Sequence, residues 1–370
     1  MPGSVPQSKS KPLTVGEVRM YDPIRLLVLG TGQMGSGIAR LALKKPGLKL
    51  VGAYARRKDR ADMDLGPLIG LDHDLGIAII NDVEEAIAVS SPDVAIQATC
   101  STLADARAEI TTLLENGIHV ISIAEEMAFP ACVSSEIADE LHVLAVRNNV
   151  SVLGTGINPG FVLDTLVITL TGVCADVTAI NATRVNDLSP YGPSVLSTQG
   201  VGLTVDEFHQ GIQDHSVVGH IGFPQSIHMI ARALGWDIER IEESREPIVS
   251  QVRRETEFIT VEPDHVAGCL HTAVAYKDGK AVITLIHPQQ VLPHLEGVDT
   301  GDSIEITGTP NIKLDGSPEI PGGQGTVAIA INSIPHVLGV APGLHTMADL
   351  PVPSAALGDI RNRVGGGADD

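Results

Sequence analysis

Short apolar segments alternate with amphipathic segments through the first half of the chain. Strands are expected at 24–29, 48–54, 77–80, 93–97, 118–123 and 150–153. Helices fit between them: in 102–115, apolar residues such as Ala106 and Ile110 recur on one face. Gly117 then follows where a helix C-terminal cap belongs. This alternation predicts a doubly wound parallel sheet of the Rossmann type, with right-handed crossovers.

The pattern changes after the glycine-rich run that begins at Gly154. Helices are expected at 161–172, 204–213 and 225–234, and strands at 177–185, 252–261, 268–276, 280–286 and 302–308. These segments predict an α+β second domain with an open, mostly antiparallel sheet. Residues 325–338 show a helical pattern again and are predicted to return to the first domain.

A glycine motif joins the first predicted strand to the helix that follows it. The sequence GTGQMG contains Gly30, Gly32, Gln33, Met34 and Gly35. In the G-x-G-x-x-G pattern, the first glycine allows a tight turn, the second lets the backbone approach a pyrophosphate, and the third lets helix and strand pack closely. The helix N-terminus then provides N–H groups to the phosphates. Because strand, turn, helix and second strand are in register, the motif predicts a dinucleotide-binding site.

The second strand ends in a basic segment. An enzyme that prefers NAD usually has a carboxylate there, which binds the ribose 2′-hydroxyl. This chain has Arg56 and Arg57 instead, and two guanidinium groups suit a 2′-phosphate. We therefore expect NADP as the cofactor, with NAD possible.

Two further segments follow strands at the edge where chemistry occurs in such sheets. Small residues after the fourth strand suit close approach to the cofactor: Ala98, Thr99 and Ser101. Glu125 and Glu126 follow the fifth strand, where a nicotinamide ring should stop. Burial and a neighbouring like charge would both raise a carboxyl pKa toward the range useful for general acid–base catalysis. The alternative is an acidic pair that only stabilises a helix N-terminus.

Composition limits the remaining classes of function. The net charge of −20 disfavours nucleic acid, and no apolar run is long enough to cross a membrane. Four dispersed cysteines and the absence of a secretory signal favour a cytoplasmic protein. The thirteen histidines show no tight ligand spacing, so no metal site is expected.

Six segments carry a family resemblance: VISIAEEMAFP at 120–130, GTGINPGF at 154–161, RVND at 184–187, QGVG at 199–202, GHIGFP at 219–224 and AINSIPH at 330–336. Together they resemble the 2,4-diaminopentanoate dehydrogenases and the related native amine dehydrogenases, which share a fold with dihydrodipicolinate reductase. The resemblance implies that a nicotinamide-dependent enzyme interconverts an amine with a ketone plus ammonia.

The same resemblance implies roles for four residues. Glu125 corresponds to the catalytic acid–base, Phe161 to an aromatic pocket wall and Asn186 to a polar pocket residue, while Thr326 is a looser match near the pocket. Whether the substrate is a diamino acid or a simple ketone and amine stays open.

The resemblance and the composition together suggest the following organisation. Residues 1–22 form a flexible tail, 23–155 the dinucleotide-binding domain with 325–357 packing back on it, 156–324 a substrate-binding and dimerisation domain, and 358–370 a second tail. An open sheet with one uncovered apolar face is a liability. We therefore expect a homodimer with its interface within 250–310, and Ile283 in the interface core.

Three other functions are weighed against this one. A dihydrodipicolinate reductase-like imine reductase would have adjacent catalytic histidines, which this sequence does not have. A semialdehyde or aldehyde dehydrogenase would use Cys100 as its nucleophile, but no nearby base is evident. A non-enzymatic dinucleotide sensor would not need an acid at the nicotinamide end.

Overall fold

The first domain is built on a seven-stranded parallel sheet. Its strands lie in the order β15-β6-β5-β4-β1-β2-β3. The computed structural model describes residues 22–365, so the predicted tail over 1–21 and the residues from 366 lie outside the described part. The strands are β1 (Ile24–Leu29), β2 (Leu48–Tyr54), β3 (Ile79–Ile80), β4 (Val94–Gln97), β5 (His119–Ser122), β6 (Ser151–Gly154) and β15 (Gly343–His345). This topology confirms the predicted Rossmann architecture.

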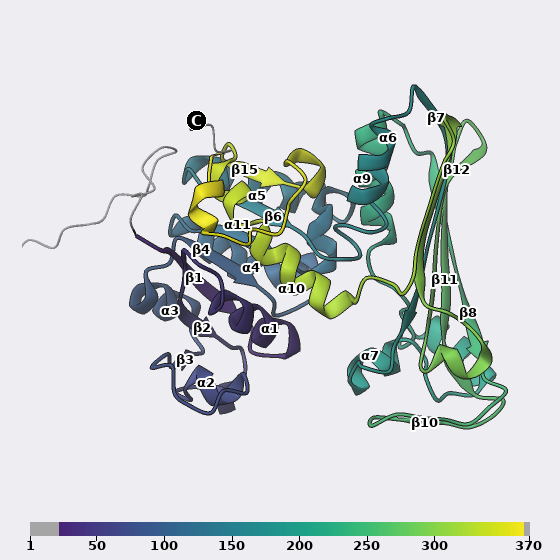
Figure 1. The fold of residues 1–370 in the computed structure, drawn as a ribbon, viewed down its shortest axis with the longest axis horizontal. Coiled ribbons are helices and arrows are strands. Elements are labelled where there is room, and N and C mark those ends of the chain that lie inside the picture. Colours follow the sequence, from purple (N-terminus) through teal and green to yellow (C-terminus); the bar gives the residue numbers. More distant parts are fainter. Residues whose placement is uncertain (1–21, 366–370) are drawn as a thin grey trace, which may run out of the picture.

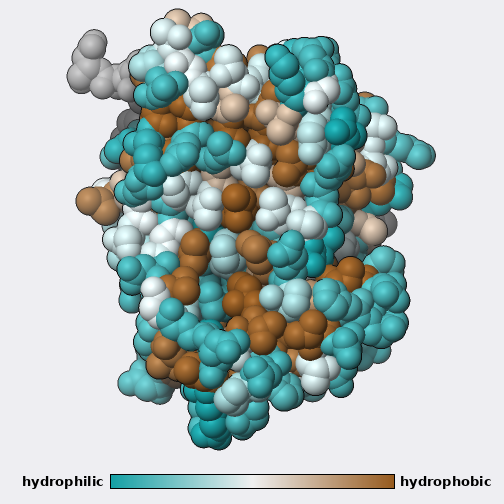
Figure 2. Space-filling model, turned by 90° about the vertical axis from the view of Figure 1, so that its right-hand side faces the viewer, coloured by the Kyte–Doolittle hydropathy of each residue, from teal (hydrophilic) through white to brown (hydrophobic). Residues whose placement is uncertain are grey.

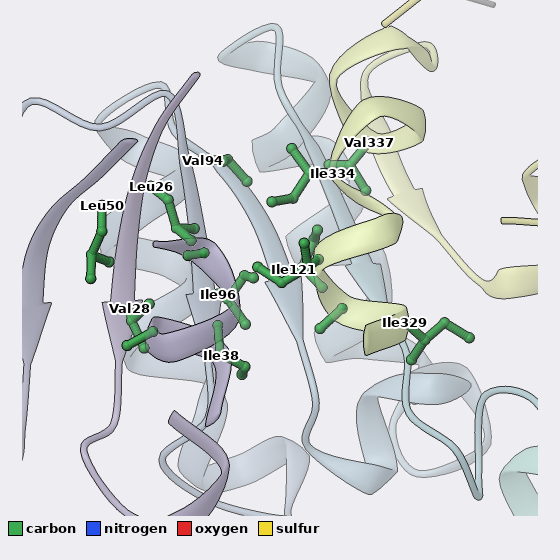
Figure 3. Packing of buried hydrophobic residues seen from close by; sticks show 14 of the residues in the cluster. Leu26, Val28, Ile38, Leu50, Val94, Ile96, Ile121, Ile329, Ile334 and Val337 are labelled. Atoms are coloured by element: carbon green, nitrogen blue, oxygen red, sulfur yellow. The ribbon is translucent and has the colours of Figure 1, made fainter. Parts of the chain in front are cut away.

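Helices cover both faces of this sheet (Figure 1). They are α1 (Gln33–Ala42), α2 (Leu65–Leu68), α3 (Val83–Ser90), α4 (Leu103–Glu115), α5 (Ser135–Arg147), α10 (Gly322–Asn332) and α11 (Ile334–Gly339). Successive residues of β1 point to opposite faces, so Leu26 and Val28 enter one core while Leu27 and Leu29 enter the other. Figure 3 shows Leu26 and Val28 in the first core, which also contains Ile329 of α10.

The C-terminal segment returns to the first domain. Helix α10 packs against α1, where Gly37 leaves room for Val327: a Cβ at Gly37 would lie 2.8 Å from Val327 Cγ2. Strand β15 pairs with β6 and extends the sheet. Although the sequence placed a tail from 358, residues 360–363 form a 3-10 turn whose Ile360 is fully buried in the first core. No helix among residues 22–365 is long and apolar enough to span a membrane.

The second domain contains a six-stranded sheet in the order β14-β13-β7-β12-β11-β8. Its strands are β7 (Asp176–Asp187), β8 (Arg240–Val249), β11 (Val266–Lys277), β12 (Lys280–Gln290), β13 (Gly301–Thr309) and β14 (Ile312–Gly316). Only β7 and β12 pair in parallel, so the sheet is mixed and mostly antiparallel, which confirms the predicted fold class. Helices α6 (Thr165–Thr171) and α9 (Phe223–Leu234) lie on its inner side, between the sheet and the first domain (Figure 1).

Among residues 22–365, no helix lies on the outer face of this sheet (Figure 1). Figure 2 looks onto this side of the molecule and shows hydrophobic side chains gathered among hydrophilic ones. Along β12, Ile283 and Leu285 point into the inner core, whereas Thr284 and Ile286 are half-buried and point outward. The prediction that Ile283 lies in an interface core is therefore wrong, because alternation along the strand places it in the core with α6 and α9.

Several segments differ from the predicted strands, among them the unpredicted β14 and β15. The strand expected over 252–261 is instead a small hairpin of β9 (Arg254–Glu255) and β10 (Thr260–Val261), separate from the large sheet. Edge strand β8 was missed because RIEESREPIV is too charged to show an apolar alternation. Charged side chains are typical of edge strands, where they discourage pairing with another chain.

Candidate active site

The glycine turn between β1 and α1 forms an open cradle. Gly30 has a φ of 108°, which favours glycine, and a Cβ at this position would lie 2.4 Å from the carbonyl oxygen of Ala98. A Cβ at Gly35 would lie 1.8 Å from the carbonyl oxygen of Gly30, so only glycine lets the helix touch the turn. At Gly32, by contrast, a Cβ would meet nothing within 4 Å.

The start of α1 leaves its N–H groups available. The N-cap residue Gly32 provides no side-chain hydrogen bond to the helix, which begins with Gln33 and Met34. Unsatisfied N–H groups and the positive end of the helix dipole suit a pyrophosphate. The residues at this turn therefore fit a dinucleotide.

The two arginines predicted to bind a 2′-phosphate make different contacts. Arg56 Nε donates to Glu109 Oε1 at 2.7 Å, and its Nη2 donates to the carbonyl oxygen of Asp105 at 2.8 Å. Arg57 instead pairs with Asp59, with 3.0 Å between Nε and Oδ1. Thus Arg56 is attached to helix α4, while Arg57 stays in the exposed turn after β2.

Sequence reasoning missed a third guanidinium at this place. Arg60 reaches back to the glycine turn, where its Nη1 donates to the carbonyl oxygen of Thr31 and to Thr31 Oγ1, the latter at 2.7 Å. The backbone also joins the two segments, because Gly30 N donates to the carbonyl oxygen of Tyr54 at 2.8 Å. The available signal was a third arginine in the same basic segment.

Buried hydrogen bonds fix the loop after β4. Thr99 Oγ1 donates to Glu109 Oε2 at 2.5 Å, and Gln97 Nε2 donates to Thr99 Oγ1 at 2.7 Å. Ser122 Oγ in turn donates to Gln97 Oε1 at 2.5 Å, which links the ends of β4 and β5. Ala98 contacts the glycine turn through its carbonyl group, so this loop borders the cradle.

Glu125 opens a 3-10 turn, Glu125–Ala128, beyond the end of β5. Burial raises the pKa of its carboxyl group, a hydrogen bond from Ser101 opposes this shift, and the charge of Glu126 adds to it. Ser101 and Glu125, which the sequence assigned to cofactor and catalysis, are therefore brought together. The pair lies at the same edge of the sheet as the glycine turn.

Glu126 faces away from this pair toward helix α4. Its Oε2 accepts a hydrogen bond of 2.6 Å from the backbone N–H of Leu103, the first residue of α4. Its own N–H donates to the carbonyl oxygen of Ser101 at 3.2 Å. Glu126 thus connects the loops that follow β4 and β5, and its carboxylate satisfies an N–H at a helix N-terminus.

The other side of the site comes from the loop that links the two domains. A Cβ at Gly154 would lie 1.7 Å from the carbonyl oxygen of Met127, so this loop packs directly on the turn that carries Glu125. Phe161 lies where the loop meets α6 and packs against the cores of both domains. Thr326 Oγ1 accepts a hydrogen bond of 3.2 Å from Ile157 N, which ties α10 to the same loop.

Asn186 belongs to a buried polar chain on the inner face of the second sheet. Its Oδ1 lies 2.9 Å from His287 Nε2, and His287 Nδ1 lies 3.4 Å from Asn158 Nδ2. These contacts fit a neutral His287 that donates through Nε2 and accepts through Nδ1. Burial lowers the pKa of His287 well below its usual value, in agreement with that state. The sequence did not identify His287, since the inward residues that precede it on the strand, Ile283 and Leu285, are apolar.

Three buried side-chain polar atoms, in the linking loop and in residues 220–225, have no hydrogen-bond partner among the described residues. They are Asn158 Oδ1, His220 Nε2 and Gln225 Oε1. The His220 ring lies 4.9 Å from that of His287. Burial lowers the pKa of His220 to about 3, and the charges of His271, Arg184 and Arg245 act in the same direction, so its imidazole is neutral at pH 7. Unpartnered buried groups of this kind are expected where a polar ligand binds.

The alternative function, an aldehyde dehydrogenase with Cys100 as nucleophile, would need an activated thiol, and Cys100 is not activated. Burial raises the pKa of the Cys100 thiol, whereas a nucleophilic cysteine needs a lowered one. Among residues 22–365, no three metal-ligating side chains come together.

Comparison with known proteins identifies the family. Residues 161–365 match the C-terminal domain of 2,4-diaminopentanoate dehydrogenase, and residues 24–122 match the N-terminus of dihydrodipicolinate reductase. The chain is 43% identical to the 2,4-diaminopentanoate dehydrogenase of Acetoanaerobium sticklandii over 344 residues, 93% of this chain and 98% of that one.

More distant relatives point to the same chemistry. An amine dehydrogenase of Streptomyces virginiae is 24% identical over 89% of this chain and 96% of its own length. The structure of an amine dehydrogenase from Mycobacterium smegmatis superimposes with a TM-score of 0.79 at 27% identity, covering 90% of this chain and 97% of that one. The chain belongs to the 2,4-diaminopentanoate dehydrogenase family, and it is an amine dehydrogenase that acts on CH–NH2 groups.

Proposed function

We propose that this protein catalyses the reversible oxidative deamination of a short diamino acid, with Glu125 as its acid–base group. The observation that carries the assignment is the Glu125 carboxyl group, whose pKa is raised by burial at the sheet edge that borders the dinucleotide turn. A carboxyl group with a raised pKa can exchange protons near neutral pH. The relative from A. sticklandii is named for 2,4-diaminopentanoate, and we propose a substrate of that class here.

In the direction of amine synthesis, ammonia adds to the ketone carbon and gives a carbinolamine. The carbinolamine takes a proton on its hydroxyl, loses water and becomes an iminium ion. A nicotinamide dinucleotide held by the glycine turn and the loop after β4 would supply the hydride that reduces the iminium carbon. Glu125 takes the proton from ammonium, returns it to the departing hydroxyl and, as a carboxylate, stabilises the iminium charge.

Three further residues are proposed to hold the substrate. Phe161 provides an apolar wall, and Asn186 and Thr326 provide polar groups beside the linking loop. Because Asn186 and Thr326 already have one protein partner each, they would orient the pocket as well as contact the ligand. The unpartnered oxygens of Asn158 and Gln225 are acceptors, and they suit the N–H donors of an ammonium group.

A diamino acid also carries a carboxylate, and one buried cation lies near this pocket. Arg184 is two residues before Asn186 on the inner face of β7 and is 2% exposed. It donates to Asp302 Oδ1 at 2.6 Å and to the carbonyl oxygen of Ile320 at 2.6 Å. His220, whose ring lies beside that of His287, is neutral at pH 7 and provides no positive charge. We therefore assign the carboxylate to Arg184.

NADP is the proposed cofactor. The turn after β2 carries arginines where an NAD enzyme usually places a carboxylate. The residues proposed to surround it are those of the glycine turn (Gly30, Gly32, Gln33, Met34 and Gly35), the basic segment (Arg56 and Arg57) and the loop after β4 (Ala98, Thr99 and Ser101).

The reaction type is tested by product analysis. The purified enzyme, incubated with 2,4-diaminopentanoate and NADP, should release ammonia and reduce NADP in equal amounts. A panel of simple amines with the same length should react more slowly, because they lack the carboxylate that Arg184 binds. Turnover of simple amines at the same rate as the diamino acid would overturn the substrate assignment. Reduction of NADP without release of ammonia would overturn the reaction itself.

We propose a homodimer formed through the outer face of the second sheet, within residues 250–310. The support is the half-buried, outward-facing side chains along β11 and β12, such as Leu270, Val274 and Ile286. No helix of the described part covers this face (Figure 1). Light scattering should give twice the chain mass of 38.8 kDa. Ile286→Asp should produce monomers, whereas Thr307→Asp, on strand β13 of the same sheet but outside this apolar cluster, should not. A parent protein of monomer mass would refute the dimer.

The state of the four cysteines indicates the cellular compartment in which the protein works. All of them are free, and none is in a disulfide. Free thiols persist where the environment is reducing, so we propose a cytoplasmic location.

A further inference from the structure

The turn after β2 contains three arginines whose charges are compensated to different extents. Arg56 pairs with Glu109, and Arg57 pairs with Asp59. Arg60 has no carboxylate partner among residues 22–365, since its two hydrogen bonds go to the carbonyl and hydroxyl oxygens of Thr31. Of the three arginines in this turn, Arg60 is therefore the one that forms no ion pair within the described part of the chain.

The position of Arg60 coincides with the place of the adenosine ribose. In a Rossmann domain, the ribose 2′-position is read by side chains at the end of the second strand, beside the glycine turn. Arg60 bridges these two segments directly, because it belongs to the turn after β2 and bonds to Thr31 between Gly30 and Gly32. Arg56 instead leans toward α4, where Glu109 and the carbonyl of Asp105 hold its guanidinium.

Arg60 also has donors to spare. A guanidinium carries five N–H groups, and both bonds to Thr31 come from Nη1. Nε and Nη2 have no hydrogen-bond partner among the described residues, which leaves three N–H groups on one edge of the fork. This edge matches the geometry of a phosphate group, which guanidinium binds in a bidentate manner.

We propose that Arg60, assisted by Arg57, binds the 2′-phosphate of NADP and is the main determinant of cofactor preference, whereas Arg56 serves to fix α4 and the loop after β4. This inference rests on the proposed preference for NADP. It changes the assignment made from sequence, where Arg56 and Arg57 were the expected pair. Asp59 opposes the preference, because its carboxylate occupies Arg57 and could itself accept a hydrogen bond from the 2′-hydroxyl of NAD.

Binding of adenosine fragments tests the inference without any turnover. Calorimetry compares 2′,5′-ADP, which carries the 2′-phosphate, with 5′-AMP, which does not. For the parent protein, 2′,5′-ADP should bind more tightly. Arg60→Ala should weaken 2′,5′-ADP about tenfold to a hundredfold, as expected for loss of a charge-assisted contact, and should change 5′-AMP by less than about threefold. Retained 5′-AMP binding also shows that the glycine turn stays folded.

Two matched variants distinguish a specific contact between Arg60 and the phosphate from a general effect of positive charge in the turn. Lys58→Ala removes one positive charge from the same exposed turn and should have little effect on either fragment. Arg60→Lys keeps the charge but loses the fork, so its affinity for 2′,5′-ADP should fall between those of the parent and Arg60→Ala. Equal losses in Arg60→Ala and Lys58→Ala would overturn the inference.

A third variant tests the opposing role of Asp59. Asp59→Asn frees Arg57 and should tighten 2′,5′-ADP; weaker binding of this fragment would contradict the assigned roles. If the parent protein binds both fragments equally, the preference for NADP itself fails. If the parent prefers 2′,5′-ADP but Arg60→Ala keeps that preference, only the assignment to Arg60 fails.

Discussion

Asp164 holds together the loop that carries the proposed pocket, and its replacement should destabilise the second domain. The residue is fully buried at the start of α6. Its Oδ2 accepts hydrogen bonds from Gly160 N at 2.7 Å and from Ser226 Oγ at 2.8 Å, while Oδ1 accepts one from Thr165 N at 2.5 Å. One carboxylate thus joins the linking loop, helix α6 and helix α9.

The cost of losing this carboxylate follows from its partners. Asp164→Ala leaves three buried donors without an acceptor, and each such group costs about 1–3 kcal/mol. Since water can enter part of the space, we expect a loss of roughly 3–6 kcal/mol in the free energy of unfolding. For a domain of this size that corresponds to a fall in melting temperature of roughly 10 °C or more.

Scanning calorimetry measures this loss, with Ser226→Ala as the matched control. Ser226→Ala removes only one donor and its bond, so it should cost about 1 kcal/mol. Binding of 2′,5′-ADP should survive in both variants, because the glycine turn lies in the other domain. If Asp164→Ala unfolds within about 1 kcal/mol of the parent, the loop is not held by this carboxylate and the reasoning fails.

Three other substitutions test separate parts of the site. Glu126→Gln keeps an acceptor for the N–H of α4 but removes a charge that adds to the effect of burial in raising the pKa of Glu125, so the acid limb of the pH–rate profile should move to lower pH; an unmoved limb would contradict this. Gly35→Ala should weaken cofactor binding at least tenfold in calorimetry, because its Cβ would overlap the carbonyl oxygen of Gly30; parent-like affinity would show that the turn adapts. Cys100→Ala should retain turnover within about threefold of the parent, since burial keeps this thiol protonated; a loss of a hundredfold would revive the thiol nucleophile.

The Rossmann domain was predictable because its signals are local. The strand before Gly30, the glycine turn and the helix after it follow one another directly, and period-two alternation in β1 supplies both cores. The segment that carries Glu125 was likewise found by its position after a strand. A local sequence pattern does not show in which direction a side chain points. Arg56 and Arg60 belong to the same turn, and only the fold shows that Arg56 contacts α4 whereas Arg60 contacts the glycine turn.

In the second domain, prediction from the sequence was limited for a different reason. Ile283 and Ile286 have equal strand propensity, and which of them faces inward depends on the register between β11 and β12, where a bulge shifts the pairing near Ala275. His287 is polar at an inward position, and only its contacts with Asn186 and Asn158 reveal that it belongs to the site.

The role of Glu125 is tested most directly by the pH dependence of reductive amination in the parent protein and in Glu125→Gln. Because the pKa of Glu125 is raised, the parent should lose activity on the acid side at a pH above the ordinary range of a glutamate, as the carboxylate becomes protonated. Glu125→Gln should be slower by roughly 100-fold or more, should lack this limb and should bind 2′,5′-ADP as the parent does. A Glu125→Gln enzyme that retains turnover within a few-fold of the parent, with the same acid limb, would remove Glu125 from the reaction.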